Sequence, residues 1–224
     1  DGRLESYPGA LTESIAHSYY RIPLRSSGGQ SVVPAPDKPN ASSWIKAPRT
    51  RHRAATVGAL ARLVVAQASA PQSAAADAAA EVEAAVGAPL AAHNTVAGRL
   101  LAGVVEVGLL VSRCFALLTA AKPGEPAATG SPRQLAVSAE GVGDVEAPAG
   151  ALRHHVTLER GKIARYDVIA PSTWNGSPAD QEGKTGPLLA ALNGAELDLT
   201  QRESRLVASR IVHSFFFSQT DAVQ

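Results

Sequence analysis

Apolar residues recur at helical spacing through the first half of the chain. Residues 55–70 carry one apolar stripe, and residues 73–87 are rich in alanine and have Val82 and Val86 on the same pattern. Gly87 and Pro89 follow and are typical of a helix end. The stripe of the first segment consists of Val57, Leu60, Ala61, Val64, Val65 and Ala68. The spacing predicts two helices.

Residues 92–121 form the longest apolar segment of the chain. Its length is sufficient for a membrane span. However, Arg99, Glu106 and Arg113 recur every seven residues and line one face of the predicted helix. A charged stripe at the centre of a bilayer is costly. The pattern therefore favours a long, mostly buried helix in a bundle.

The period changes to two beyond the Pro-, Gly- and Ser-containing linker Lys122–Pro132. Leu152–Glu159 alternates between apolar and other residues, and Lys162–Ala170 is a second β-prone run. Arg160 and Gly161 between them suit a tight turn, because glycine readily takes a positive φ. These residues predict a β-hairpin.

Residues 1–54 are polar and rich in Pro, Gly and Ser. A short helix is predicted at Leu11–Tyr20, with Thr12 as its N-cap. Ser26–Ser43 is expected to be a loop.

The last part of the chain begins with the turn-rich stretch Pro171–Pro187. A short helix is predicted at Gly186–Leu192, and a final helix from about Gln201 to Phe215. Phe215–Phe217 would be a hydrophobic plug or a partner contact if ordered, or an exposed patch in a fragment. One side of the final helix carries Leu206, Val207, Ile211 and Phe215.

The predicted fold is mainly α with a small β-hairpin unit, an α+β class built on a helical bundle. We expect residues 1–54 to form an irregular segment with a short helix. Residues 55–121 form the helical-bundle part. Residues 133–224 form a β-hairpin and C-terminal helix part of the same domain.

Composition limits the chemistry. The 224 residues carry a net charge of +1, which gives no indication of a nucleic-acid partner. The basic run Arg49–Arg53 is interpreted as a solvated loop. Cys114 is the one cysteine, so neither an internal disulfide nor a Cys-only metal site is possible, and we expect it to be a small buried apolar residue. Because the chain begins at Asp1 and has no methionine, we expect a fragment or a processed piece.

Several single residues invite a functional interpretation. His154 and His155 are adjacent on a predicted strand and point to opposite faces, which favours structural roles over chelation of one ion. Glu146 fits a buried carboxylate and a hydrogen-bonded loop residue equally well. Trp44 and Trp174 are expected to be core or interface anchors.

Six groups of motifs, in order from about residue 11 to residue 215, resemble signatures of the large subunit of nickel–iron hydrogenases, in its C-terminal half. The matching segments are Thr12-Glu13 with His17-Ser18, Ser43-Trp-Ile-Lys-Ala-Pro-Arg49, Val57-Gly-Ala-Leu-Ala-Arg62, Gly141-Val-Gly-Asp-Val-Glu-Ala-Pro148 with Gly150-Ala-Leu152, Pro171-Ser-Thr-Trp-Asn175 and Ile211-Val-His-Ser-Phe215.

The resemblance implies a helical bundle packed against β elements, and a nickel–iron centre whose iron carries cyanide and carbon monoxide. In that family four cysteines hold the two metals, two from an N-terminal motif and two from a C-terminal motif. The activity implied is dihydrogen oxidation or evolution, with electrons leaving through an iron–sulfur small subunit.

This chain departs from the family at the metal ligands. Neither cysteine motif is present, and Ser218, Gln219 and Asp221 after the last matching segment cannot replace soft bridging thiolates. The family's arginine over the iron and its cyanides is Ala149 here. We therefore assign no catalytic residue and no metal ligand.

The resemblance implies that the matching residues of this chain lie near the nickel–iron centre and do not bind its metals. Pro171 and Ser172 match the loop that receives a cyanide ligand, where a hydroxyl can donate a hydrogen bond. Lys46 matches a lysine near the family's buried cation site. Glu13 and His154 also fall on family positions, without a proton-transfer role assigned here.

Three hypotheses follow. In the first, the chain is a truncated or degenerate large subunit that needs an iron–sulfur small subunit and a missing cysteine-bearing N-terminal half. In the second, it is a maturation scaffold that holds the iron–cyanide unit and works with maturation proteins. In the third, it is a metal-free structural pseudo-subunit. We expect association with a membrane through a partner, or a cytoplasmic location for a scaffold. As a half-molecule, it is expected to be poorly soluble alone.

Overall fold

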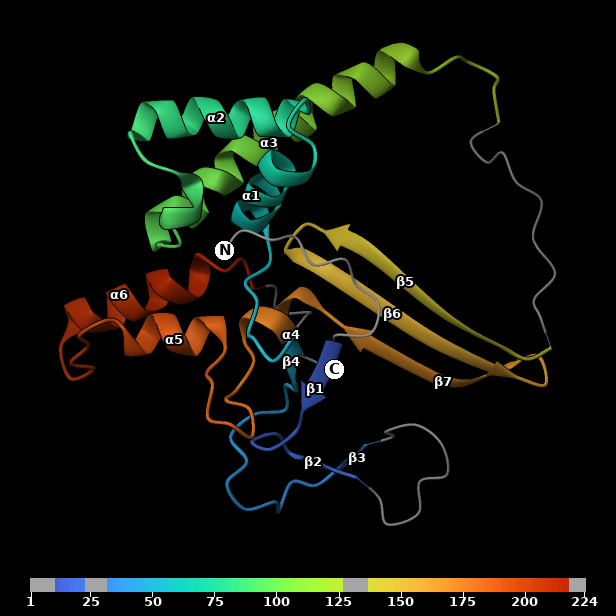
Figure 1. Ribbon diagram of the computed structural model, residues 1–224, viewed down its shortest axis with the longest axis vertical. Coiled ribbons are helices and arrows are strands. Elements are labelled where there is room, and N and C mark those ends of the chain that lie inside the picture. Colours follow the sequence, from blue (N-terminus) through green and yellow to red (C-terminus); the bar gives the residue numbers. More distant parts are fainter. Residues whose placement is uncertain (1–10, 23–31, 127–136, 218–224) are drawn as a thin grey trace.

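The computed structural model describes residues 11–22, 32–126 and 137–217 (Figure 1). Three helices, α1 to α3, gather at one end of the molecule. A long three-stranded sheet extends from the centre to one side, and helices α5 (Pro187–Asn193) and α6 (Arg202–His213) lie together on the other side. Short strands from the N-terminal part lie beneath the central helix α4 (Pro171–Asn175).

The helical end is built from α1 (Ala59–Ser69), α2 (Ala74–Val86) and α3 (Val96–Ala120), with a 3-10 turn at Leu90–Ala92. The predicted helices are confirmed. The side chain of Ser73 caps α2, and Gly87 ends it in the left-handed conformation. Alanine on α2 lets the helices approach closely. The buried core consists of Ala59, Leu60, Leu63, Ala79, Leu90 and Ala102.

Only the first part of α3 is buried, so the prediction of a mostly buried helix is wrong for this chain. Its buried residues are Gly98, Arg99 and Ala102, and every residue from Leu110 to Ala120 is exposed. Cys114 is exposed as well, which contradicts its predicted burial. The reason is that α1 and α2 cover one side of α3 near its start, and the described residues provide no neighbour for the rest. By length and composition α3 is the one described helix that could cross a membrane.

Two charged side chains fix the first half of α3 to this chain. Arg99 donates to Ser214 Oγ at 2.9 Å and lies over the ring of Phe215, 4.0 Å from its centroid. Glu106 accepts two short hydrogen bonds from the guanidinium of Arg62 on α1. Burial lowers the pKa of Arg99. These contacts place this half of the helix inside a protein rather than in lipid.

The sheet contains β5 (Ala139–Ala147), β6 (Gly150–Glu159) and β7 (Lys162–Ile169), in the order β5-β6-β7 and antiparallel. The predicted hairpin is confirmed, with Arg160 and Gly161 both at positive φ in its turn. Strand β5 was not predicted, because its many glycine and charged residues hide the alternation.

The adjacent histidines of β6 use different partners, as their alternation predicts. His154 Nδ1 lies 2.6 Å from the hydroxyl of Tyr166, and His155 Nε2 lies 2.6 Å from a carboxylate oxygen of Glu140. Neither pair is buried, and the two histidines do not converge on one point.

The predicted helix at Leu11–Tyr20 is wrong. Residues Leu11–Ser14 form β1, which pairs antiparallel with β4 (Ala47–Thr50), and Tyr20–Arg21 forms β2, which pairs with β3 (Val33–Pro34). Pairing with strands much later in the chain overrides the local helical pattern. Of the predicted loop at 26–43, residues 26–31 lie outside the described residues; the rest holds β3 and turns.

The C-terminal part forms α4 (Pro171–Asn175), α5 (Pro187–Asn193) and α6 (Arg202–His213). Helices α5 and α6 confirm the predictions, whereas α4 was hidden in a stretch expected to be turns. Trp174 is buried in α4, and Trp44 is 46% exposed and contacts the rings of Tyr19 and Tyr20.

Phe215 is buried and Phe216 is exposed, so the predicted aromatic plug is formed only in part. Of the predicted apolar side of α6, Ile211 is buried, whereas Leu206 and Val207 are exposed.

Candidate functional site

The segment Pro171–Asn175 forms the buried centre of the molecule. Pro171 occupies the first turn of α4 directly after β7, a position where its missing N–H costs nothing. All five residues of the helix are buried, including Ser172 at 3% exposure. Helix α4 contacts β4 and β6, so the segment expected to be a loop that receives a cyanide ligand is a short helix between the sheet and the N-terminal strands.

Asn175 joins this turn to the start of the helical bundle. Its Oδ1 accepts from the backbone N–H of Val57, and its Nδ2 donates to the carbonyl of Val57, both at 3.0 Å. The side-chain amide thus pairs with both backbone groups of Val57, as the backbone of a neighbouring strand would. Asn175 is 1% exposed, so these bonds satisfy a buried polar side chain.

Arg49 of β4 lies at the centre of the loop that follows α4. Its guanidinium donates to Asp180 Oδ2 at 2.7 Å, Ser177 Oγ at 3.1 Å and the carbonyl of Lys184 at 2.7 Å. It donates further to the carbonyls of Pro48 and Pro178. Arg49 is 2% exposed, so the interpretation of Arg49–Arg53 as a solvated loop is wrong for its first residue.

Asp180 is also fully engaged. Its Oδ1 accepts from the backbone N–H groups of Glu182 and Lys184, each at 3.0 Å. Burial alone raises the pKa of Asp180, but the hydrogen bonds from Arg49 and from these two backbone groups outweigh burial and lower its pKa. The site therefore holds a buried, fully bonded ion pair.

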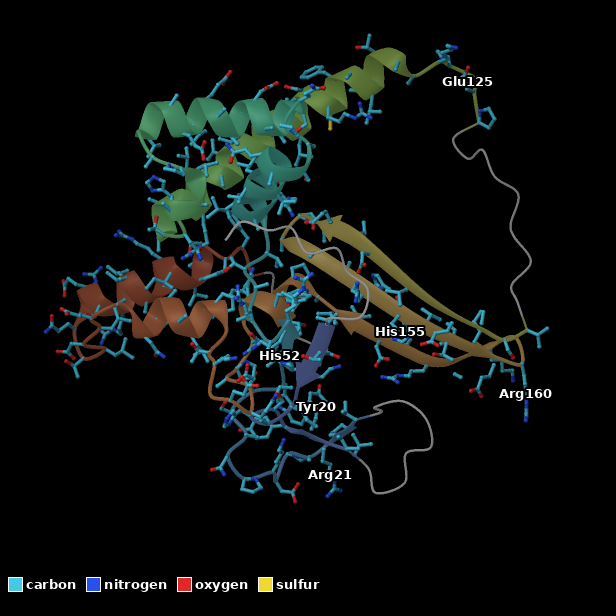
Figure 2. All side chains as sticks on the ribbon, in the orientation of Figure 1. Tyr20, Arg21, His52, Glu125, His155 and Arg160 are labelled. Carbon is cyan, nitrogen blue, oxygen red and sulfur yellow. The ribbon has the colours of Figure 1, made fainter. Side chains whose placement is uncertain are left out.

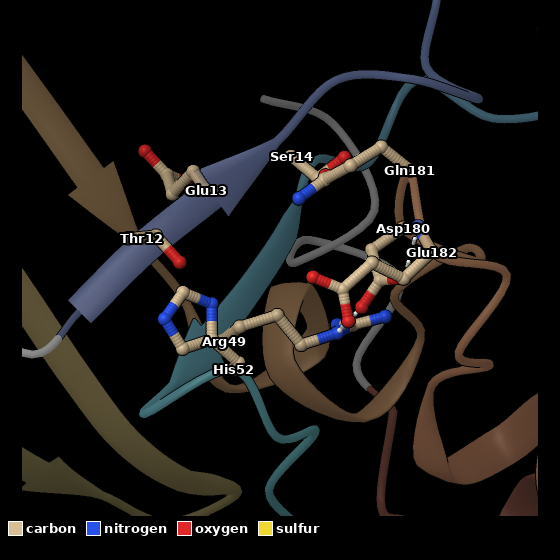
Figure 3. Close-up of a pocket in the computed structure, with 8 residues that line it drawn as sticks. All are labelled: Thr12, Glu13, Ser14, Arg49, His52, Asp180, Gln181 and Glu182. Carbon is tan, nitrogen blue, oxygen red and sulfur yellow. Dashed lines mark hydrogen bonds and ion pairs between the residues drawn. The ribbon is translucent and has the colours of Figure 1, made fainter.

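A small polar cavity opens beside this ion pair, between β1 and the loop after α4 (Figure 3). Figure 3 shows Arg49 reaching towards Asp180 across one side of the cavity. The lining residues are Thr12, Glu13, Ser14, Arg49, His52, Asp180, Gln181 and Glu182. All of these residues are polar or charged, and acidic and basic groups line the cavity together.

Lys46 directly precedes β4, and its Nζ lies 2.9 Å from Glu13 Oε2 on β1. Because β4 also contacts α4, the predicted residues Lys46, Pro171 and Ser172 belong to one junction of the fold. The amino group of Lys46 therefore forms an ion pair with the carboxylate of Glu13. The other oxygen of Glu13, Oε1, is buried and has no hydrogen-bond partner among the described residues.

A second, more apolar pocket lies where the sheet meets α4, and its lining includes Leu152 and Trp174. Nearby, Glu146 on β5 lies 2.8 Å from Arg62, and its side chain is 53% exposed. Of the two interpretations left open for Glu146, neither a buried carboxylate nor a loop residue is right: it is a half-exposed strand residue in an ion pair. Ala149 lies in the turn between β5 and β6.

The donor atoms of a nickel–iron centre are not gathered here. Among the described residues no group of three His, Cys, Asp or Glu side chains could hold a metal ion. The one cysteine is on the exposed part of α3. The residues present therefore do not fit a centre held by four thiolates.

Sequence reasoning missed the Arg49–Asp180 pair and the Asn175 bridge. Arg49 and Asn175 both lie inside recognisable motifs, but a motif does not reveal which distant residue each side chain bonds to. Asp180 gave no signal, because a single aspartate in a Pro- and Gly-rich stretch is typical of a turn.

Comparison with known proteins identifies the relatives of this chain. The family described as nickel-dependent hydrogenase matches residues 4–216. The chain is 31% identical over 211 residues to the Hydrogenase-1 large chain of Citrobacter freundii, covering 91% of this chain and 35% of that protein. It is 30% identical over 250 residues to the uptake hydrogenase large subunit of Azotobacter chroococcum mcd 1, covering 93% and 40%.

Solved structures agree. The H2-activated [NiFeSe]-hydrogenase of Dm. baculatum matches with a TM-score of 0.78 at 27% identity, over 100% of this chain and 46% of that one. The reduced Ni-Fe-Se hydrogenase of D. vulgaris Hildenborough also gives 0.78, at 26% identity. The predicted α+β fold class is thereby confirmed, and the chain spans less than half the length of these relatives.

The motifs that suggested the resemblance lie within the matched region, and the fold matches along the whole chain. The chain belongs to the nickel-dependent hydrogenase family.

Proposed function

We propose that this chain is the C-terminal-half unit of a hydrogenase large subunit that shapes the surroundings of a nickel–iron centre without supplying its thiolate ligands. The observation that carries the proposal is the intact, buried α4 turn in a chain whose one cysteine lies elsewhere, on an exposed helix. The family's scaffold is kept and its metal ligands are not.

The residues of the α4 junction have a defined part in this proposal. Ser172 lies in the first turn of a buried helix and is itself buried, so its hydroxyl is enclosed by protein. Lys46 and Glu13 form an ion pair at the neighbouring strands. In the complete assembly these groups would orient and insulate the centre, whereas the thiolates would come from another segment.

The chain on its own is therefore proposed to be inactive. A thiolate is the ligand that soft metal pairs require, and Ala149 offers no charged donor in place of the arginine that the family has there. We further propose that the chain works with an iron–sulfur small subunit and reaches the membrane through such a partner rather than by its own helix.

Metal analysis with a partner test checks this proposal. The chain is purified alone and after co-expression with the small subunit of a related uptake hydrogenase, and nickel and iron are quantified per chain. We expect no stoichiometric nickel in the chain alone and co-purification with the small subunit. Stoichiometric nickel in the chain alone would overturn the proposal.

The same measurement separates the two alternatives. Sub-stoichiometric iron without nickel, together with binding to maturation proteins, would identify a maturation scaffold. A stable complex with the small subunit that lacks nickel and also lacks iron beyond the small subunit's own would identify a structural pseudo-subunit.

A further inference from the structure

Lys38 lies in the loop between β3 and β4, and its ammonium group contacts the stretch between β1 and β2. The ammonium donates to three backbone carbonyl oxygens, those of Ile15, of Ser18 at 3.1 Å and of Tyr20 at 3.0 Å. A lysine ammonium has three N–H donors and no acceptor, so these bonds use all of its donors. Lys38 is half-buried, and among the described residues no carboxylate forms an ion pair with it.

The three carbonyl oxygens are held in place by bonds that do not involve Lys38. The backbone N–H of Ser18 donates to the carbonyl of Ile15 at 3.1 Å, and the N–H of Tyr20 donates to the carbonyl of Ser18 at 2.7 Å. Ser18 is fully buried, and its hydroxyl donates to the carbonyl of Ile45 at 2.7 Å. The stretch therefore turns its carbonyls inwards by its own bonding.

The loop that carries Lys38 is likewise joined to this stretch without the help of the lysine. The N–H of Ala35 donates to the carbonyl of Tyr19 at 2.8 Å, and the N–H of Ser42 donates to the carbonyl of His17 at 2.9 Å. Strands β2 and β3 also pair here, and Figure 1 shows them side by side. The ammonium thus fills a site that the two segments form between them.

The chemistry of this site is that of a monovalent cation site. Backbone carbonyl oxygens that converge on one positive charge replace the hydration shell of an ion such as potassium. Calcium and magnesium sites ordinarily include carboxylates, and none reaches this charge among the described residues. The ammonium of lysine is a compact point charge and can take the place of such an ion.

We propose that the carbonyls of Ile15, Ser18 and Tyr20 form a monovalent-cation site and that the ammonium of Lys38 is its built-in occupant. Removal of the lysine side chain would open the site to potassium or ammonium ions. The inference does not rest on the proposed function, because it needs neither a metal centre nor a partner subunit.

The site lies beneath an aromatic cluster, which gives it a local reporter. The ring of Trp44 lies 5.1 Å from the ring of Tyr19 and 5.7 Å from that of Tyr20, measured between centroids. Trp44 is 46% exposed, whereas Trp174 is 3% exposed. Quenching of tryptophan fluorescence by acrylamide therefore reports mainly on Trp44 and on the segment that carries the carbonyls.

The experiment compares Lys38→Met with the parent chain in the chlorides of choline, sodium, potassium and ammonium at equal ionic strength. Methionine retains most of the side-chain length and removes the charge. In choline, which is too bulky for the site, we expect the variant to melt about 4 °C or more below the parent. Potassium or ammonium should restore most of this loss and should return the quenching of Trp44 to the parent's value.

Lys162→Met is the matched control, because Lys162 is exposed on β7 and has no hydrogen bond or ion pair among the described residues. The control and the parent should respond alike to the four salts. A readout on the parent itself needs no variant. Acetylation by sulfosuccinimidyl acetate, followed by peptide mass spectrometry, should be several times slower at Lys38 than at Lys162.

Three results would overturn the inference. The first is equal melting of Lys38→Met in all four salts, and the second is acetylation of Lys38 as fast as that of Lys162. The third is a gain in melting temperature with potassium that leaves the quenching of Trp44 unchanged, since the ion would then act elsewhere. None of these results alters the nickel content of the chain alone, which tests the proposed function separately.

Discussion

Arg49 and Asp180 lie 131 residues apart in the chain, and their side chains meet at 2.7 Å inside the protein. The side chains of both residues are almost completely buried. This pair joins β4 to the loop after α4, so it holds the N-terminal strands against the C-terminal part of the fold. In Figure 2 the side chains of this central region are densely packed between the strands and α4.

Arg49→Ala should destabilise the protein by about 3–5 kcal/mol, because it leaves the Asp180 carboxylate buried without its cation. Urea denaturation of the purified protein measures this change. The control is Lys122→Ala, which removes the ion pair with Glu125 whose two side chains are both exposed, and should cost about 1 kcal/mol or less. Equal losses for the two variants would contradict the structural role of Arg49.

The stability of the protein should fall in acid because of Asp180. Its pKa is lower in the folded protein than in the unfolded chain, so its contribution is fully present above the unfolded value of about 3.9. The contribution is lost as pH falls through the lower folded pKa. Denaturation curves between pH 7 and pH 2.5 measure this slope.

Asp180→Asn should be less stable than the parent at pH 7, and it should lose less stability than the parent between pH 5 and pH 2.5. A variant that keeps the parent's full acid dependence would show that other carboxyl groups account for it. Asp144, whose pKa is lowered mainly by its hydrogen bond from Arg153, contributes in the same direction from an exposed position.

Asn175→Leu should destabilise the protein by about 1–3 kcal/mol, because it leaves the partly buried N–H and carbonyl of Val57 without these partners. Chemical denaturation gives the value, and hydrogen exchange at the Val57 amide should accelerate. Asn193→Leu at the exposed end of α5 is the control and should change stability little. The role of the bridge would be disproved by an unaltered exchange rate at Val57.

Gly150→Ala should destabilise the protein markedly, by about 2 kcal/mol or more, for two reasons. Gly150 has a φ of 139°, and an added Cβ would lie 2.6 Å from Val57 Cγ2 and 2.8 Å from the backbone nitrogen of Gly58. Gly143→Ala in the neighbouring strand meets no atom within 4 Å and should be tolerated. Thermal melting of both variants tests the contrast.

Substituting the exposed second half of α3 should improve the behaviour of the isolated chain. Val107→Lys combined with Val111→Lys should reduce aggregation of the chain alone, since both residues are exposed apolar side chains of one strip. Light scattering as a function of concentration measures this. A parent chain that is already a monodisperse monomer with a cooperative melt would contradict the expected poor solubility.

Local sequence patterns correctly predicted the elements that are stabilised by residues close together in the chain. Helix α2 followed from its alanines, its Ser73 cap and its terminal Gly87, and the β6–β7 hairpin followed from its alternation and its Arg160-Gly161 turn. Strand β1 was mistaken for a helix, because its partner β4 lies more than thirty residues further along the chain. Propensity alone cannot foresee such a pairing.

The candidate site also has a part that motifs predicted and a part that depends on residues far apart in the chain. Motif resemblance predicted Lys46, Pro171 and Ser172 as site residues, and the contact of α4 with β4 brings their segments to one junction. The polar bonds that hold the junction were not visible from the sequence, since they link Arg49 and Asn175 to distant partners. Burial of Cys114 was wrongly expected, because an apolar helix was assumed to have neighbours on every side.

The contact between Arg99 and Ser214 has a consequence for synthesis on the ribosome. The two residues are 115 positions apart, so the buried guanidinium emerges long before its hydroxyl partner does. At typical elongation rates the nascent helical end would wait roughly 6–23 s for Ser214 to be made. During that interval the guanidinium has only its bonds to the neighbouring Asn94, and its contacts with Ser214 and the Phe215 ring form last.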